Sequence, residues 1–249
     1  MNDEVLARLR GCLAREELVG LATIVGGEGP GAALVGRQLL VWPGGQMFGD
    51  LGSRRLDQRV AIFAEQPLTA LASRRKELDH ESGSVDLFFE VFPPPPKLIV
   101  IGAVHVAIHL IEYANSQGFS TYVIDPRSAF ATPERFTSAD RLLIEWPAEA
   151  LAEIPINEAT YFAFLSHDPK IDLPGLKVAL ESNARYIGAL GSKKTHAKRV
   201  AALEEMGFGG DEIARIHSPI GLDLGGRRAE EIALSVIAEI VAVSHGVGT

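Results

Sequence analysis

Cysteine is nearly absent from this sequence, because Cys12 is the single cysteine among 249 residues. One cysteine excludes an internal disulfide framework, a zinc ribbon and an iron–sulfur site built on this chain alone. We therefore expect a reducing compartment, the cytoplasm. Cys12 falls on the apolar face of the first predicted helix, where most thiols are buried and inert.

Basic residues are in the minority, since 24 Lys and Arg stand against 32 Asp and Glu and leave a formal charge of −8. Such a surface repels phosphodiester backbones, so we expect no nucleic-acid partner. Long apolar runs are also missing, since Glu239 interrupts the most apolar stretch near the C-terminus. Residues 1–4 are acidic, whereas the start of a signal peptide is basic. We expect neither a membrane span nor an export signal.

A run of four prolines divides the chain. With 47% hydrophobic and 22% charged residues, the composition is that of a globular protein with a full core. Pro93-Pro94-Pro95-Pro96 cannot donate ladder hydrogen bonds and favours the stiff polyproline II form. We interpret residues 93–96 as a linker between a small α+β domain at residues 1–92 and a larger domain at residues 97–249.

The spacing of apolar residues predicts the elements of residues 1–92. They are a helix at 5–13, a strand at 19–25 that ends at the glycines 26–27, a hairpin of strands 38–42 and 46–48, a helix at 51–65 and a strand at 85–92.

Short apolar runs alternate with longer amphipathic ones after the prolines. The predicted strands are 98–101, 120–124, 141–145, 161–165 and 185–189, and the predicted helices are 104–116, 148–153, 172–181, 194–206 and 229–243. Because the strands are apolar on both faces, the pattern predicts a Rossmann-like, doubly wound parallel sheet of the α/β class.

The first of these strands runs into a glycine turn and then a helix, which is the setting of a dinucleotide fingerprint. Gly102 can make the tight turn, and Ala107 is an accepted small residue at the third position. Val104, however, stands where the second glycine lets a pyrophosphate approach the backbone. A ligand shifted outward onto the N-terminus of the helix, beside Ala103 and His105, stays possible. The alternative is a turn that binds nothing.

Asp125 ends the second strand, at the spacing of about twenty residues at which the fold places an acceptor for ribose hydroxyls. Arg127 follows it and could pair with a phosphate or a carboxylate. The alternative is an Asp-Pro turn with a solvated arginine, which we favour for Arg127 considered alone.

Ser166, His167 and Asp168 follow the fourth strand and are expected at the carboxyl edge of the sheet beside Gly102. His167 could act as an acid, a base or a ligand, and Asp168 could orient it. Alternatively, Asp168 is the N-cap of a helix that has Pro169 at its first position.

The fifth strand leads into a second candidate anion-binding loop. Gly188 and Gly191 allow close backbone approach, Ser192 can cap the next helix, and Lys193 and Lys194 add positive charge. The alternative is that both lysines are exposed residues of the first helical turn.

Residues 216–226 form a long irregular stretch that contains Pro219, Gly221 and Asp223. Ordered loops of this kind often lie against a site, although this one could also simply lead to the last helix. His105, His109 and His217 do not have a metal-binding spacing, so we expect no metal site.

The order of these motifs resembles the XdhC/CoxI family of xanthine dehydrogenase accessory proteins over nearly all of residues 97–249. The motifs are Gly102-Ala103-Val104-His105, Asp125-Pro126-Arg127 followed by Phe130-Ala131-Thr132-Pro133-Glu134-Arg135-Phe136, Ser166-His167-Asp168, Tyr186-Ile187-Gly188-Ala189-Leu190-Gly191-Ser192 and His217-Ser218-Pro219-Ile220-Gly221-Leu222-Asp223. The resemblance implies a small N-terminal domain joined to a Rossmann domain. It also implies an accessory protein that binds the molybdenum cofactor and assists its sulfuration and its insertion into a molybdenum hydroxylase. Such a protein is a cofactor chaperone and not a classical enzyme.

The partners that the resemblance implies are the apoenzyme of a molybdenum hydroxylase, such as xanthine or carbon monoxide dehydrogenase, a cysteine desulfurase and a second copy of the chain. Many relatives carry a Gly-Gly-Cys-Val-Glu-like element in the N-terminal domain. Here the corresponding residues are 53–57, with Arg55 at the cysteine position. Sulfur for the cofactor would therefore have to come from the desulfurase.

We expect one cofactor-binding cleft at the carboxyl edge of the sheet, with His167 and Asp168 as the candidates for any catalysis. The expected binding residues are Gly102, Ala103, Val104, His105, Asp125, Arg127, Ser166, His167, Asp168, Gly188, Gly191, Ser192, Lys193, Lys194, Pro219, Gly221 and Asp223. Two other functions stay open: an NAD(P)-dependent oxidoreductase that uses His167 as acid and base, and a nucleotide-sensing Rossmann module without catalysis.

Overall fold

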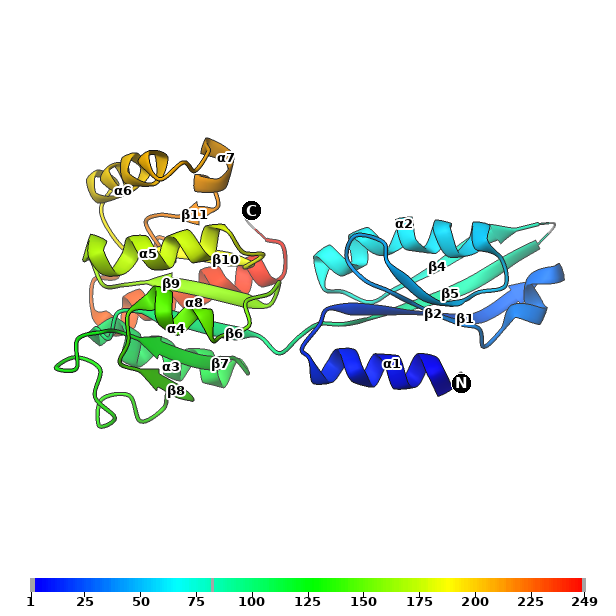
Figure 1. Ribbon diagram of the computed structural model, residues 1–249, viewed down its shortest axis with the longest axis horizontal. Coiled ribbons are helices and arrows are strands. Elements are labelled where there is room, and N and C mark those ends of the chain that lie inside the picture. The colour runs from blue at the N-terminus through cyan, green and yellow to red at the C-terminus, as the bar shows by residue number, and fades with distance from the viewer. Residues whose placement is uncertain (1–2, 82, 248–249) are drawn as a thin grey trace. The chain divides into compact units, whose positions relative to one another are not determined.

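The computed structural model describes residues 3–81 and 83–247, and the chain forms two compact units (Figure 1). Unit 1 is Met1–Pro94 and unit 2 is Pro95–Thr249. The prolines at 93–96 belong to no helix or strand. Among the described residues, no helix is both long enough and apolar enough to cross a membrane.

Unit 1 is an antiparallel sheet with a helix on each face. The strands are β1 (Val19–Glu28), β2 (Gln38–Val41), β3 (Met47–Asp50), β4 (Arg74–His80) and β5 (Gly83–Phe92), in the order β3-β2-β1-β5-β4. The helices are α1 (Asp3–Ala14), α2 (Arg54–Ala70) and the short 3-10 helix η1 (Gly29–Leu34). The predicted hairpin at 38–48 is confirmed by the pairing of β2 with β3.

Successive side chains of β2 point to opposite faces of this sheet, and they show that the two helices cover opposite faces. Leu39 belongs to the apolar cluster that contains α2, and Leu40 belongs to the cluster that contains Val5, Leu9 and Cys12 of α1. Figure 1 shows α2 above the sheet and α1 below it. Cys12 is fully buried, as its helical position predicts.

One expectation for unit 1 was wrong, and one strand was missed. The strand β1 does not end at Gly26-Gly27 but runs to Glu28, because an irregularity between Ile24 and Gly26 absorbs the glycines while pairing with β5 continues. The strand β4 was not predicted, because Arg74–His80 is an edge strand that is mostly charged and exposed.

Unit 2 is a parallel sheet in the order β11-β10-β9-β6-β7-β8. Its strands are β6 (Lys97–Ile101), β7 (Ser120–Ile124), β8 (Arg141–Leu143), β9 (Thr160–Phe164), β10 (Tyr186–Ala189) and β11 (Ile216–His217). Its helices are α3 (His105–Ser116), α4 (Pro147–Ala152), α5 (Pro169–Leu180), α6 (Lys193–Glu205), α7 (Gly210–Ile213) and α8 (Ala229–Ser244).

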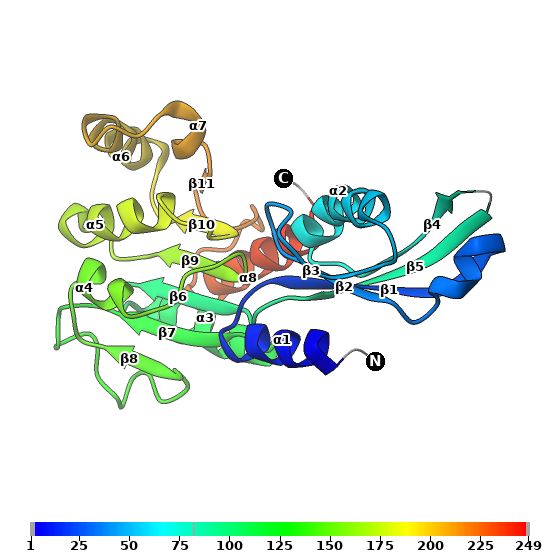
Figure 2. The same cartoon turned by 45° about the vertical axis from the view of Figure 1, so that its right-hand side comes forward.

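Helices cover both faces of this sheet (Figure 1 and Figure 2). Leu98 and Val100 pack with the residues of α3 and α8, whereas Ile99 and Ile101 pack with those of α4, α5 and α6. The predicted doubly wound α/β fold is therefore confirmed. The stretch 216–226 is less irregular than expected, because its first two residues form β11.

We expect Phe89→Ala to lower the free energy of unfolding of unit 1 by about 3–5 kcal/mol, because it empties a packed site. The Phe89 ring is fully buried, lies edge-on to Phe63 and occupies the space that the missing Cβ of Gly20 leaves. Urea denaturation followed by the fluorescence of Trp42, in a Trp146→Phe background, measures this loss.

The matched control is Phe88→Ala, which removes the same ring from a side chain that is 39% exposed on the other face of β5. This variant should lose about 1 kcal/mol or less. Equal losses in the two variants would contradict the assignment of Phe89 to the core.

Candidate functional site

The strand order places a topological switch point between β6 and β9. The chain proceeds from β6 to β7 and β8 on one side, and β9, β10 and β11 lie on the other. The strands are parallel, so the loops that follow β6, β7, β9 and β10 meet at one edge of the sheet. Open α/β sheets bind their ligands in the crevice at such a point.

Gly102 lies at this switch point, with a φ of +109°. A Cβ on Gly102 would lie 2.7 Å from the backbone nitrogen of Ser166, so the close approach of the loops after β6 and β9 requires glycine here. Val104 is half-buried and occupies the N-cap of α3 without a side-chain capping bond, and His105 is exposed. The positive end of α3 is thus not capped by a side chain at the switch point.

Asp125 is fully buried, and its carboxylate accepts four hydrogen bonds. Oδ2 accepts from the backbone N–H of Ala103 (2.8 Å) and from Nη2 of Arg127 (2.7 Å), while Oδ1 accepts from the backbone N–H and from Nε of Arg127 (both 2.9 Å). Four bonds fill the acceptor positions of a carboxylate. Asp125 therefore ties the loop after β7 to the loop after β6, and no acceptor position remains for a ribose.

Hydrogen bonds from Arg127 and Ala103 decide the ionisation of Asp125. Burial raises the pKa of Asp125, but the hydrogen bonds from Arg127 and from the N–H of Ala103 outweigh burial, so the pKa lies below its usual value. Arg127 is therefore held in an ion pair and also lies over the ring of Phe130. The solvated arginine that we favoured from sequence was wrong.

Asp168 caps α5, accepting from the backbone N–H of Lys170 at 2.9 Å. The capping alternative for Asp168 is confirmed. Ser166 is buried, and its hydroxyl donates to Oδ1 of Asp172 (2.6 Å) and accepts from the N–H of Asp168 (3.1 Å). Between them, His167 is exposed and has a φ of +61°, a region that non-glycine residues rarely adopt. The loop thus presents the imidazole of His167 at the surface.

A buried pair of charges beneath this loop was missed from the sequence. Asp172 and Arg199 are both nearly inaccessible, with Oδ2 and Nη2 3.8 Å apart. Nη2 of Arg199 also donates to the carbonyl of Leu190 at 3.0 Å. Burial raises the pKa of Asp172 despite the Ser166 hydrogen bond and the charge of Arg199, and burial lowers the pKa of Arg199. The pair links α5, α6 and the loop after β10.

One sequence signal could have revealed this pair. Asp172 precedes the buried Leu176 by one helical turn, and Arg199 precedes the buried Leu203 in the same way. A charge at an apolar position of a helix is a candidate for a buried polar network.

A cavity of about 110 Å3 lies between α5 and α6 at this edge. His167, Asp172, Thr195, Lys198 and Arg199 line it, together with Pro169, Leu173 and Ala202. Ligand pockets usually measure about 300–1,000 Å3, so this cavity accommodates one polar group of a larger ligand. Of the predicted binding residues, which all lie in the described part of the chain, only His167 lines the cavity.

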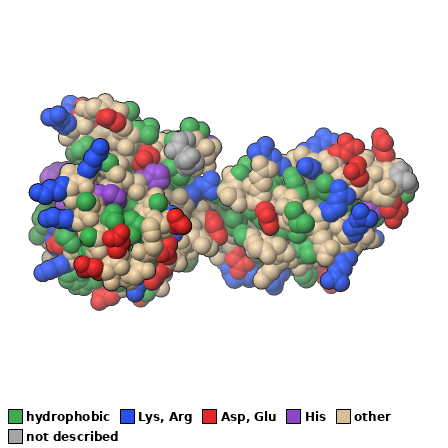
Figure 3. Space-filling model, turned by 90° about the horizontal axis from the view of Figure 1, so that it is seen from above, with side chains coloured by type: hydrophobic (Ala, Val, Ile, Leu, Met, Phe, Trp, Pro, Cys, Tyr) green, Lys and Arg blue, Asp and Glu red, His purple; other side chains and the backbone are tan. Residues whose placement is uncertain are grey.

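The N-terminus of α6 lies beside the cavity. Ser192 caps the helix by accepting from the backbone N–H of Thr195 at 3.2 Å, as predicted. Lys193 and Lys194 are exposed on the first turn. Figure 3 shows blue Lys and Arg side chains along the left margin of unit 2.

Packing accounts for two of the predicted glycines, Gly188 and Gly221. A Cβ on Gly188 would lie 2.5 Å from the hydroxyl of Tyr186, and a Cβ on Gly221 would lie 2.5 Å from Oγ of Ser235. The N–H of Gly221 donates to Glu239 at 2.8 Å. The exposed Asp223 accepts from the N–H of Gly225 within its own loop, and Pro219 follows a cis peptide bond. The structure does not bring these residues into the cavity.

Both units match models of one family. Residues 98–240 match the XdhC Rossmann domain, and residues 12–79 match the XdhC and CoxI family. A crystal structure described as a xanthine dehydrogenase from Bacillus halodurans is similar with a TM-score of 0.53 and 21% identity, covering 96% of this chain and 94% of that chain. At that identity the likeness shows the fold alone.

Three curated relatives have longer chains. The uncharacterized protein YqeB of Escherichia coli is 28% identical over 84% of this chain and 40% of its own. A probable xanthine dehydrogenase subunit of Bacillus subtilis is 32% identical over 66% and 48%, and the molybdenum cofactor insertion chaperone PaoD of Escherichia coli is 32% identical over 62% and 42%. The matched part is less than half of each of these relatives.

We expect Asp125→Asn to lower the free energy of unfolding of unit 2 by about 3 kcal/mol at pH 7, because Arg127 loses a buried partner. Since the pKa of Asp125 is lowered in the folded state, its carboxylate stabilises the fold above the ordinary Asp pKa of about 3.9 and ceases to do so as pH falls through the folded-state value. Urea denaturation from pH 7 to the acid limit should show the free energies of unfolding of wild type and Asp125→Asn converging.

The control is Asp223→Asn in an exposed loop, whose free energy of unfolding should stay within about 0.5 kcal/mol of wild type. A difference between wild type and Asp125→Asn that is independent of pH would refute the ion-pair role.

Proposed function

The chain belongs to the XdhC and CoxI family, and from this membership we propose that it binds the molybdenum cofactor and assists the maturation of a molybdenum hydroxylase. The observation that carries the proposal is the match of residues 98–240 to the XdhC Rossmann domain. The name of a relative, the molybdenum cofactor insertion chaperone PaoD, supports the proposal. The cofactor is cargo here, and the chain holds and delivers it.

The switch point has the groups that a phosphate-bearing cofactor requires. The N-terminus of α3 has no side-chain cap, and a helix N-terminus of this kind favours an anion. Lys193, Lys194 and Lys198 add exposed or cavity-lining positive charge from α6. A cavity of about 110 Å3 suits one polar group, so most of the cofactor would rest on the edge. The phosphate would bind along this edge, outward of Val104.

His167 is the residue placed to move a proton. Its ring is exposed and lines the cavity, whereas Asp168 is occupied as the cap of α5. Ser166, hydrogen-bonded to Asp172, fixes the loop that presents this ring. We assign to His167 contact with the bound cofactor and proton exchange with it, and to Asp172 and Arg199 the positioning of the loop.

An ordinary NAD(P) site is less compatible with the same geometry. The carboxylate of Asp125, which would accept from the ribose, already accepts four hydrogen bonds from Ala103 and Arg127. Val104 places an isopropyl group where the second glycine of the fingerprint stands. Both features favour a ligand that lies farther out than a dinucleotide.

The proposal includes the partners that maturation needs. The acceptor is a molybdenum hydroxylase apoenzyme, and a cysteine desulfurase supplies sulfur for the cofactor. Cys12 is fully buried, and burial raises its pKa, so it is a poor source of a reactive thiolate. By the family resemblance, Arg55 corresponds to the position at which many relatives have cysteine. We also propose that the chain acts as a cytoplasmic homodimer.

The double variant Lys193→Glu/Lys194→Glu should lower the cofactor content by about tenfold or more, because two charge-assisted contacts become repulsive. The protein would be purified without oxygen from cells that make the cofactor. Molybdenum is then counted by mass spectrometry, and pterin by the fluorescence of its oxidised form.

The control is Arg10→Glu/Arg74→Glu, which makes the same change of charge at exposed residues of unit 1 and should keep wild-type cofactor content. If the wild-type protein carries no pterin but retains NAD(P), the proposal is wrong and the NAD(P)-dependent oxidoreductase is favoured instead. An equal loss of cofactor in both double variants would contradict the assignment of cofactor binding to Lys193 and Lys194 of α6.

A further inference from the structure

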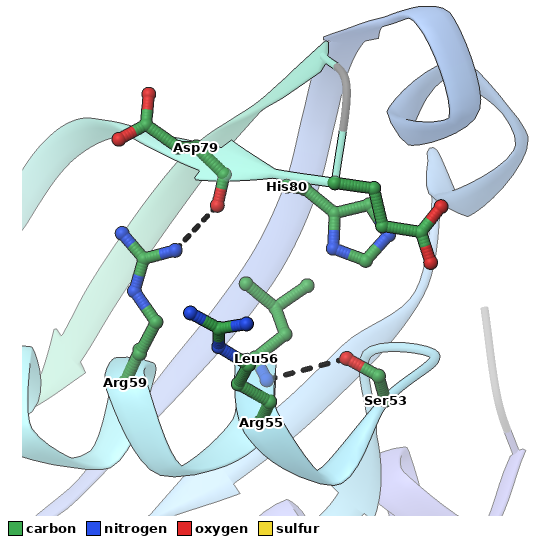
Figure 4. Close-up of a pocket in the computed structure, with 7 residues that line it drawn as sticks. Ser53, Arg55, Leu56, Arg59, Asp79 and His80 are labelled. Atoms are coloured by element: carbon green, nitrogen blue, oxygen red, sulfur yellow. Dashed lines mark hydrogen bonds between the residues drawn. The ribbon is translucent and has the colours of Figure 1, made fainter.

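Unit 1 contains a cavity that the proposed function does not use. It measures about 440 Å3 and lies between the start of α2 and the end of β4 (Figure 4). Ser53, Arg55, Leu56 and Arg59 line it from α2, and Asp79, His80 and Glu81 line it from β4 and the turn that follows. The buried side chain of Leu56 belongs to the core of unit 1, so the cavity has a fixed apolar floor.

Arg59 is held in place by the main chain of β4. Its Nη1 donates to the backbone carbonyl of Asp79. Figure 4 shows that the carboxylate of Asp79 points away from this guanidinium. Because the carbonyl takes one of five N–H donors, Arg59 keeps its full charge and the other donors for a ligand.

The side chains of Arg55 and His80 have no hydrogen-bond or ion-pair partner within residues 3–81 and 83–247. Figure 4 shows the guanidinium of Arg55 on the same side of α2 as that of Arg59, with the imidazole of His80 facing them across the cavity. A guanidinium has the planar fork that pairs with two oxygens of a phosphate. Two such groups and an imidazole therefore converge on one space.

The start of α2 adds two donors from the main chain. Ser53 caps the helix by accepting from the N–H of Leu56 at 3.3 Å. In the described part of the chain, no acceptor is recorded for the N–H groups of Arg54 and Arg55. A helix N-terminus favours an anion, and here it lies beside the two guanidinium groups.

We infer that unit 1 binds a small organic phosphate monoester, with its phosphate held by Arg55, Arg59 and the first turn of α2. A cavity of 440 Å3 falls within the size range of small-molecule sites and exceeds what a bare phosphate fills, so the ligand carries an organic part. The carboxylate of Glu81 can accept from hydroxyl groups of that part. The acidic residues around the cavity, in a chain of net charge −8, repel a polyanion.

This inference is independent of the proposed function, because its residues all belong to unit 1 and the cofactor is assigned to unit 2. The test is calorimetric titration of the full chain with ribose 5-phosphate, inorganic phosphate and ribose. We expect ribose 5-phosphate to bind more tightly than inorganic phosphate, and ribose not to bind.

Arg55→Ala should weaken the binding of ribose 5-phosphate by about tenfold to a hundredfold, as the loss of a charged hydrogen-bonding group does. Arg54→Ala is the matched control, because Arg54 is its exposed neighbour and does not line the cavity. This control should bind as wild type does. Thermal unfolding should give the same midpoint for both variants, and His80→Ala, which leaves α2 unchanged, should weaken binding as well.

Three outcomes would overturn the inference. They are wild-type protein that binds neither phosphate compound, an equal loss in Arg54→Ala and Arg55→Ala, and binding of ribose as tight as that of ribose 5-phosphate. None of them bears on the molybdenum content of the protein, so the failure of this site and the failure of the proposed function are distinguishable.

Discussion

The buried carboxylate of Asp125 and its four hydrogen bonds organise the edge of unit 2 on which the functional account depends. They join the loops after β6 and β7, and the missing side chain of Gly102 lets the loop after β9 approach within contact distance. From there Ser166, Asp172 and Arg199 carry the connection to α6 and the loop after β10. Four loops from distant parts of the sequence thus form one preorganised surface.

The charges of this edge fall into two groups with different roles. Asp125, Asp172 and Arg199 are buried, and each is within an ion pair or hydrogen bonds, so they hold the loops and contribute little charge to the exterior. Lys193 and Lys194 are exposed, and they do not hold the loops together. In an acidic chain, such a local positive margin favours an anion at this end of the sheet.

Most strands and helices of unit 2 were predictable because each is a local pattern of apolar residues, as was the cap that Asp168 makes on α5. The short elements α7 and β11 were not predicted, because four and two residues are too few to show such a pattern. The edge strand β4 was not predictable, because its residues are mostly charged and exposed, as is common at the edge of a sheet, and show no apolar pattern. The pair Asp172 and Arg199 depends on loops that only the fold brings together. Likewise, the sequence alone does not distinguish a glycine that lets a phosphate approach the backbone from Gly188 or Gly221, where close packing leaves no space for a Cβ.

Hydrogen exchange measured by mass spectrometry on cofactor-loaded and cofactor-free protein tests the central claim most directly, because bound ligand slows the local opening of the backbone it touches. We expect slower exchange in residues 102–107, 166–173 and 190–199, the segments that surround the switch point and the cavity between α5 and α6. Protection confined to unit 1, or to residues 216–226, would contradict this expectation.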